Sequence, residues 1–264
     1  MTDTKDKLLK TIEELRIYRL DLTKEDLEKS YQQMKEQGFP DNARIRFIAD
    51  LGGSTEIEYH YHLICKEWEE DKKLNLESSF EKHGKKGLDF LFRQIDKKQD
   101  DKLKINTVYL ASKIISKSKN KDFYLPYCNL ILPLLNSLLD IKDSVLRRKI
   151  IISIGWMGSE NEIEILNRQL LNDKDPLCRA WSGASLMQMS YHRVGKKILQ
   201  EKTKDVFIDA ITVEKDIYAK GIKIEAAQTI FDKKWISSSA VENICSEKIE
   251  KAGKSAITFL NKIC

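Results

Sequence analysis

Apolar residues recur at helical spacing along the chain, and between residues 130 and 188 the pattern nearly repeats itself. A shift of 32 residues aligns leucine with leucine, aspartate with aspartate and arginine with arginine. The aligned pairs are Leu134/Leu166, Leu138/Leu170, Leu139/Leu171, Asp143/Asp175, Arg147/Arg179 and Ile154/Leu186. A repeat of this length, with two apolar segments around an Asp-containing turn, predicts stacked pairs of helices.

The helix-capping signals along the chain, and its low content of proline and glycine, also favour an all-α fold. Thr23 with Asp26, and Ser159 with Glu162, have the spacing of a capping box, in which each side chain accepts from a backbone N–H of the other residue. Ser239 with Glu242 predicts one last helix over about 240–262. The chain has only four prolines and eleven glycines, and strand signals are nearly absent, so we expect helices throughout.

The repeat extends more weakly in both directions. A shift of 43 residues backward places Lys104 under Arg147, and a shift of 44 forward places Lys223 under Arg179. We therefore expect about four repeats over residues 79–235, with atypical N-terminal capping helices in 1–78 and a C-terminal capping helix in 236–264. Because no Pro/Gly/Ser-rich linker separates these parts, 1–264 is predicted to form one continuous α-solenoid.

Residues 146–186, LRRKIIISIGWMGSENEIEILNRQLLNDKDPLCRAWSGASL, resemble HEAT repeats, particularly the short kind found in phycobilisome-lyase-type proteins. The resemblance is specific over about 60 residues and fainter over about 160, and the first 70 residues show none. It implies a right-handed α-α superhelix of antiparallel helix pairs. It also implies that the turn aspartates and the following arginines form a ladder between neighbouring repeats. Proteins of this kind are mostly protein-binding scaffolds, so the resemblance gives only a tendency in function.

The composition bears on the cellular compartment of the protein and on the classes of partner that it binds. The net charge of +5 comes from 46 basic and 41 acidic residues, an interspersed excess that does not by itself indicate nucleic-acid binding. The five cysteines are scattered without a CxxC pair, which suits a reducing compartment. The N-terminus has no apolar leader, and the most apolar run, residues 124–139, contains two prolines and is too short to span a bilayer. We expect a cytoplasmic protein with no membrane partner.

Two groups of residues are candidates for a catalytic or metal-binding site, and the first consists of two Asp/Arg pairs. The pairs Asp143/Arg147 and Asp175/Arg179 could be an acid and an anion binder, but a catalytic pair is normally unique, and this one recurs. We interpret all four residues as a structural ladder. Since no nucleophile, phosphate-loop or metalloprotease motif is present, we expect no catalytic residue, no cofactor and no small-molecule substrate.

His62 and Cys65 are the candidate metal ligands, because a spacing of three places them on one helix face. A structural zinc ion needs four ligands, and no second pair is visible, while His83 and His192 look isolated. We therefore expect no metal, with His60 and His62 at the surface or at an interface.

The second helix of each repeat is expected to line a concave surface. Its outward stripe, taken from the alignment, comprises Asn106, Leu110, Lys113, Lys149, Ser153, Trp156, Trp181, Ser185, Gln188, Glu225, Thr229 and Asp232. Tryptophan is favoured at binding hot spots, since it buries a large rigid area and keeps one donor. We predict that a partner binds Trp156 and Trp181, with Lys149, Gln188 and Glu225 fixing its register. The alternative is that either indole packs between repeats.

These observations favour a non-enzymatic scaffold that binds another protein, with a bacterial immunity protein or a regulatory component as two possible settings. The rival function is a DNA-binding protein or an alkylpurine DNA glycosylase with a HEAT-like fold. In such glycosylases the catalytic aspartate lies near a Trp-Asp segment, which Trp68-Glu69-Glu70-Asp71 does not match. The predicted stripe is basic in the earlier repeats and acidic in the last, whereas a groove for duplex DNA would be basic throughout.

Overall fold

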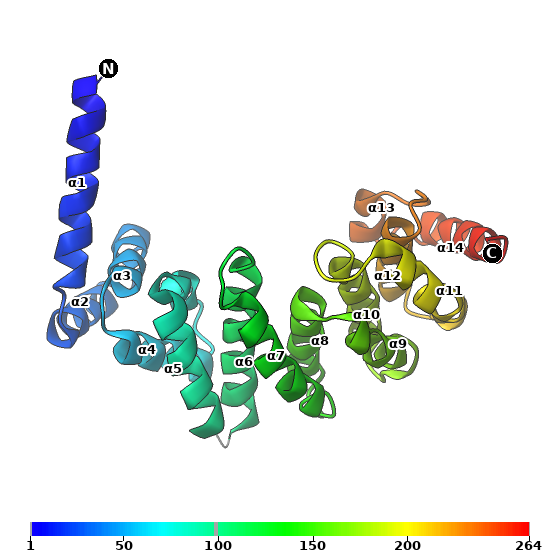
Figure 1. Cartoon of the computed structure of the whole chain (residues 1–264), viewed down its shortest axis with the longest axis horizontal. Coiled ribbons are helices and arrows are strands. Elements are labelled where there is room, and N and C mark those ends of the chain that lie inside the picture. Colours follow the sequence, from blue (N-terminus) through cyan, green and yellow to red (C-terminus); the bar gives the residue numbers. More distant parts are fainter. Residues whose placement is uncertain (1, 98–99, 264) are drawn as a thin grey trace. The chain divides into compact units, whose positions relative to one another are not determined.

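The computed structural model describes residues 2–97 and 100–263, and over these residues the chain is helical, with no strand (Figure 1). The chain divides into two compact units, residues 1–114 and 115–264, with the division inside one helix, α6. The elements are α1 (Thr2–Leu20), α2 (Lys24–Glu36), α3 (Asp41–Gly53), α4 (Ile57–Glu69), η1 (Leu76–His83), α5 (Gly84–Lys97), α6 (Asp101–Lys117), α7 (Tyr124–Ser137), α8 (Ser144–Met157), η2 (Glu160–Glu162), α9 (Ile163–Asn172), α10 (Pro176–Met189), α11 (Lys196–Val213), α12 (Ile217–Ile230), α13 (Ser238–Glu242) and α14 (Ser246–Leu260).

In the first unit, a close approach between α3 and the 3-10 helix η1 organises the core. A Cβ at Gly52 would lie 2.6 Å from the Ser79 Cβ, so only glycine fits there. Ser79 Oγ donates to the Ile48 carbonyl at 2.7 Å across the same contact. Leu51 and Phe80 are fully buried beside it. The predicted capping box of Thr23 and Asp26 is present at the start of α2, as is that of Ser159 and Glu162 before α9 in the second unit.

Three helices of the second unit are alike in length and in the way they begin. α8, α10 and α12 each have 14 residues, and α10 contacts both of the others (Figure 1). Each begins after an aspartate whose carboxylate accepts from a backbone N–H of the first turn: Asp143 from Val145, Asp175 from Cys178 and Asp216 from Ala219. The β-branched triplet at 150–152 is helical, because Ile150 and Ile151 pack into the core, where packing outweighs propensity.

The repeat register differs from the prediction after α10. The first residues of α8 and α10 are 32 apart, as predicted, but those of α10 and α12 are 41 apart and not 44. The change arises largely because α11 has 18 residues where α9 has 10. Lys220, and not Lys223, therefore lies at the position of Arg179. Ile222, and not Glu225, lies at the position of Trp181.

The C-terminal segment also differs from the prediction. In place of one helix over 240–262, α13 ends at Glu242 and α14 begins at Ser246. Ile244 adopts a left-handed φ of 49°, and the Cys245 N–H donates to the Ala240 carbonyl at 2.9 Å. This is the 6→1 hydrogen bond of a Schellman helix end, with isoleucine in the place where glycine is usual.

None of the helices in the described ranges combines the length and the apolar character that crossing a lipid bilayer requires.

Candidate functional site

A ladder of ion pairs joins successive turns of the second unit. Arg147 binds Asp173 through two hydrogen bonds, from Nε to Oδ2 at 2.6 Å and from Nη2 to Oδ1 at 2.7 Å. Arg179 binds Glu214 in the same way, at 2.8 Å and 2.7 Å. At the equivalent position of α12, Lys220 Nζ lies 2.8 Å from Glu250 Oε1. Each basic residue thus reaches an acidic residue of the following helix pair.

The acidic partners in this ladder are not the turn aspartates that the sequence suggested. Asp143 and Asp175 accept backbone hydrogen bonds as N-caps, which occupies their carboxylates. The arginines instead bind Asp173, two residues before a cap, and Glu214, two residues before the next one. Sequence alignment could not identify this position, since the first of these acids is Asp and the second is Glu.

A second cation joins the ladder at Glu214. The Glu214 carboxylate is fully buried, and Lys223 Nζ, also fully buried, lies 2.7 Å from its Oε2. Burial alone would raise the pKa of Glu214, but hydrogen bonds from Arg179 and Lys223 bring that pKa down to about 2. Burial lowers the pKa of Lys223, although its ion pair opposes this shift. Lys223 Nζ also donates to the Ala210 carbonyl at 3.1 Å.

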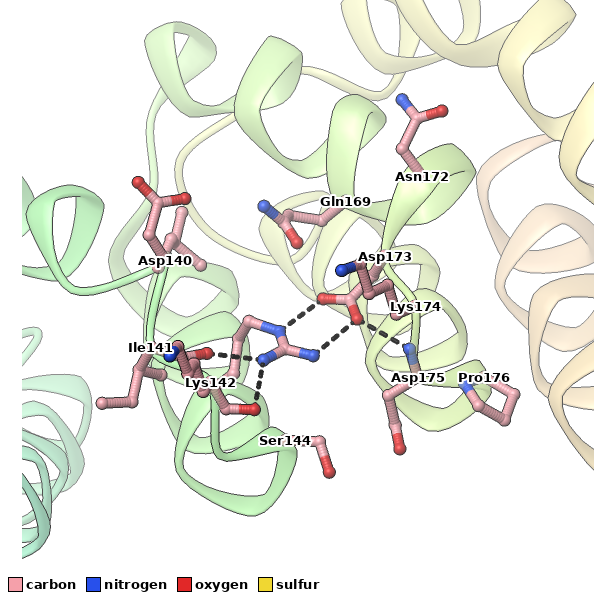
Figure 2. Close-up of a pocket in the computed structure, with 12 residues that line it drawn as sticks. Asp140, Ile141, Lys142, Ser144, Gln169, Asn172, Asp173, Lys174, Asp175 and Pro176 are labelled. Atoms are coloured by element: carbon pink, nitrogen blue, oxygen red, sulfur yellow. Dashed lines mark hydrogen bonds and ion pairs between the residues drawn. The ribbon is translucent and has the colours of Figure 1, made fainter.

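The two arginines also fix the backbone of their own turns. Arg147 Nη1 donates to the carbonyls of Ile141 at 2.6 Å and Lys142 at 3.3 Å. Arg179 Nη1 donates to the carbonyls of Asp173 at 2.8 Å and Lys174 at 3.3 Å. Between these turns lies an open cleft of about 740 Å³ (Figure 2). Its lining includes the labelled side chains of Lys142, Lys174, Asp140 and Asn172.

The predicted partner-binding residues lie on α8, α10 and α12, and they differ in exposure. Trp181 is 38% exposed, whereas Trp156, Lys149, Gln188 and Glu225 are half-buried. The structure brings Lys149 and Trp181 to equivalent positions on adjacent helices, and likewise Trp156 and Gln188. Glu225 stands apart from this set, because in the observed register it lies at the position of Ala184.

Four members of the predicted outward stripe are buried: Asn106, Leu110, Ser153 and Ser185. Ser153 Oγ donates to the Lys149 carbonyl within α8, and Ser185 lies at a tight contact between α8 and α10. Ser185 Oγ donates to the Ile151 carbonyl at 2.9 Å, and a Cβ at Gly155 would lie 2.7 Å from the Ser185 Cβ. The exposed stripe is therefore narrower than the sequence alignment suggested.

Several exposed or half-buried apolar side chains of α8, α10 and α12 were not singled out from the sequence. Val145 is 54% exposed and Tyr218 is 37% exposed, and Leu177 and Ile222 are half-buried. Val145, Leu177 and Tyr218 each follow a capping aspartate by two residues. The signal was present in the sequence as Lys-Asp-x-apolar, which occurs as KDSV at 142–145, KDPL at 174–177 and KDIY at 215–218.

The histidines of the first unit are arranged differently from the prediction. His60 is fully buried, and its Nδ1 lies 2.9 Å from His83 Nε2, so His83 is not isolated and His60 is not at the surface. His60 Nε2 lies 2.9 Å from the Leu76 carbonyl, which assigns Nε2 as the donor and Nδ1 as the acceptor from His83. Burial lowers the pKa of His60 to about 3 and that of His83 to about 4.

His62 and Cys65 do not converge, since His62 is exposed and Cys65 is buried. Over residues 2–97 and 100–263, no group of three or more His, Cys, Asp or Glu side chains has an arrangement that could hold a metal ion.

Comparison of the chain with protein-family models, with curated proteins and with solved structures finds no match.

Proposed function

We propose that this chain is a non-enzymatic scaffold of HEAT-like antiparallel helix pairs that binds another protein. In this proposal the pairs stack as a right-handed superhelix, and the exposed sides of α8, α10 and α12 form its concave binding face. A cytoplasmic location, and an immunity or regulatory role, belong to the same proposal.

The exposure of Trp181 is the observation that carries the proposal. Trp181 is 38% exposed on the middle helix of three, one helical turn after Leu177, and Ile222 holds the equivalent position on the adjacent helix α12. Burying a large aromatic ring and its aliphatic neighbours against a partner removes apolar area from water. Aromatic anchors of this kind dominate the energy of protein–protein interfaces.

The polar groups near this face have structural partners, which supports a binding role more than a catalytic one. Asp143 and Asp175 cap helices, and Arg147 and Arg179 are held in two-point ion pairs. A general acid or base must be within reach of a substrate proton. These carboxylates are directed at backbone N–H groups or at guanidinium groups instead.

The proposal is tested with Trp181→Ala, because this side chain protrudes more than that of Trp156. We expect a protein retained from source-cell extract by the wild-type chain to be lost with Trp181→Ala, while helical circular dichroism and the thermal unfolding midpoint stay unchanged. The matched control is Tyr191→Ala, an aromatic residue that is 63% exposed in the turn after α10 and outside the face. Equal retention by all three proteins would contradict the proposal.

The DNA glycosylase alternative predicts different results. It demands salt-sensitive binding to duplex DNA and release of alkylated bases. Trp68, the tryptophan of the Trp-Glu-Glu-Asp segment, donates through Nε1 to Glu77 Oε2 at 3.3 Å, and Glu77 Oε1 lies 3.2 Å from Lys113 Nζ. Release of free base by the wild-type chain would replace the scaffold proposal with an enzymatic one.

A further inference from the structure

Each of the three turns that precede α8, α10 and α12 carries an exposed lysine at the same place. Lys142, Lys174 and Lys215 each stand one residue before the capping aspartate. We call them the rim lysines. Among the described ion pairs, none involves their ammonium groups. Because they hold equivalent positions before three adjacent helices, the rim lysines form a row of cations, and Val145, Leu177 and Tyr218 form an apolar row three residues further on.

The ladder positions the backbone of all three rim lysines. The carbonyls of Lys142 and Lys174 accept from Arg147 and Arg179, each at 3.3 Å. The Lys215 N–H donates to Glu214 Oε1 at 3.0 Å, and the same oxygen lies 2.7 Å from Arg179 Nη2. Fixing these backbones before binding reduces the ordering entropy that association would otherwise cost.

Most carboxylates near the row are neutralised by fixed partners. The capping aspartates face helix N-termini, where the backbone dipoles favour negative charge. Asp173 and Glu214 are bound to arginines. Asp140 is exposed and lines the cleft between the first two turns. Among the described carboxylates of these turns, it is the one without a fixed partner. The edge thus presents three exposed ammonium groups and one carboxylate without a fixed partner.

We infer that this edge recognises an acidic segment of the partner protein, in which carboxylates alternate with apolar side chains. Adjacent packed helices lie roughly 10 Å apart, so successive rim lysines call for carboxylates at about that interval along the partner. The apolar side chains of the segment would cover Val145, Leu177 and Tyr218. This inference rests on the proposed function and adds the chemistry of the partner to it.

A protein segment fits this edge better than a nucleic acid does. Phosphate backbones are bound by continuous positive surfaces, and their affinity comes from cation contacts. Here each lysine is followed directly by an aspartate and, two residues later, by an exposed or half-buried apolar residue. The apolar row would have nothing to bury against a phosphate backbone.

The test is selection from a phage-displayed library of random peptides of about 16 residues. A helical peptide of this length is long enough to reach all three rim lysines. The bait is the full chain. The first variant is Lys142→Glu/Lys174→Glu/Lys215→Glu. The matched control is Lys248→Glu/Lys251→Glu/Lys254→Glu, which changes the charge equally at exposed positions on α14. A fluorescent DNA duplex is titrated against the same three proteins.

We expect the enriched peptides to combine Asp or Glu with apolar residues. Their affinity should fall about tenfold or more in the rim-lysine variant and stay unchanged in the control, since each exposed pair contributes modestly and three are reversed. Val145→Ser/Leu177→Ser/Tyr218→Ser should weaken the same peptides. No enrichment, enrichment of peptides that ignore the three lysines, or duplex binding lost in the rim-lysine variant would each overturn the inference. If Trp181→Ala abolishes peptide binding and the rim-lysine variant does not, the inference fails while the proposed function stands.

Discussion

The Arg179 guanidinium and the Glu214 carboxylate, 35 residues apart in the chain, form a two-point ion pair at 2.8 Å and 2.7 Å that joins α10 to the turn before α12. Arg147 and Asp173 form the same pair one repeat earlier. The ladder is thus a set of contacts between consecutive helix pairs. It also contains deeply buried charge, since Glu214 and Lys223 are fully inaccessible.

Removing the negative charge of Glu214 should destabilise the second unit strongly. Glu214→Gln leaves Arg179 and Lys223 facing each other without a counter-charge, and breaking a buried pair in this way costs about 3–5 kcal/mol. Urea unfolding followed by circular dichroism measures the change. The matched control is Glu250→Gln on the pair with Lys220, which is partly open to solvent on the Glu250 side, so the loss should stay within about 1 kcal/mol. Equal losses in the two variants would show that the burial of Glu214 has no energetic consequence.

Acid should destabilise the first unit through its buried histidines. Burial lowers the pKa of His60 to about 3 and of His83 to about 4, while both groups titrate near 6.5 when the chain is unfolded. The unfolded state therefore binds more protons below pH 6.5. The free energy of unfolding should then fall by roughly 1.4 kcal/mol per pH unit for each histidine, until the folded state also protonates near pH 4 to 3.

Thermal unfolding at pH 7.5, 6 and 5 detects this loss. His83→Gln keeps a donor for His60 Nδ1 but does not titrate, so its pH slope should be smaller than that of the wild type. His62→Gln, which makes the same replacement at an exposed position on the same helix as His60, is the control. Burial also lowers the pKa of His192 in the second unit, which adds a component of the same sign to all three proteins.

Two glycines in α8 and α10 should respond oppositely to alanine. At Gly155 a Cβ would lie 2.7 Å from the Ser185 Cβ, so Gly155→Ala should cost about 1–3 kcal/mol through overpacking. At Gly183 the nearest atoms would be 3.4 Å and 3.5 Å away, which is ordinary contact. Gly183→Ala should therefore stabilise by up to about 1 kcal/mol, because alanine is the better helix former. Denaturant midpoints of the two variants decide this, and a destabilised Gly183→Ala would contradict the packing described for α10.

The turn aspartates should behave as caps. Asp175→Ala removes the acceptor for the Cys178 N–H and should cost about 1 kcal/mol, whereas Asp175→Asn keeps an acceptor oxygen and should cost only a few tenths. The comparison uses chemical unfolding at neutral pH. A large loss for Asp175→Asn would instead indicate that the negative charge itself is needed at this turn.

The sequence predicted the helices around the 32-residue repeat well, because α8 and α10 share both their length and their caps. It missed the second register, because Lys220 and Lys223 are both lysines, and the choice between them depends on the length of α11. It missed the ladder acids for a similar reason: the reach of an arginine side chain, and not its alignment, selects Asp173 over Asp175.

The contact between His60 and His83 could not be predicted either. The two residues are 23 apart in sequence, and they meet because η1 is packed against α4. For the candidate site, the sequence pointed to Trp181, which stays a prediction, and not to the apolar residues in the first turns of α8, α10 and α12. Val145, Leu177 and Tyr218 differ in residue type. The 32-residue repeat already aligns Val145 with Leu177, and the observed start of α12 adds Tyr218 to that position.

The arginine ladder also determines the distance between successive turns of the second unit. Each guanidinium binds the carbonyls of its own turn on one side and the carboxylate of the next pair on the other, so one rigid planar group sets the interval between turns. The ladder therefore fixes the spacing at which a bound partner must place its own groups along the edge. An Arg147→Lys substitution would preserve the charge while removing the planar fork that fixes the interval, and the register of the edge would then depend on a flexible side chain.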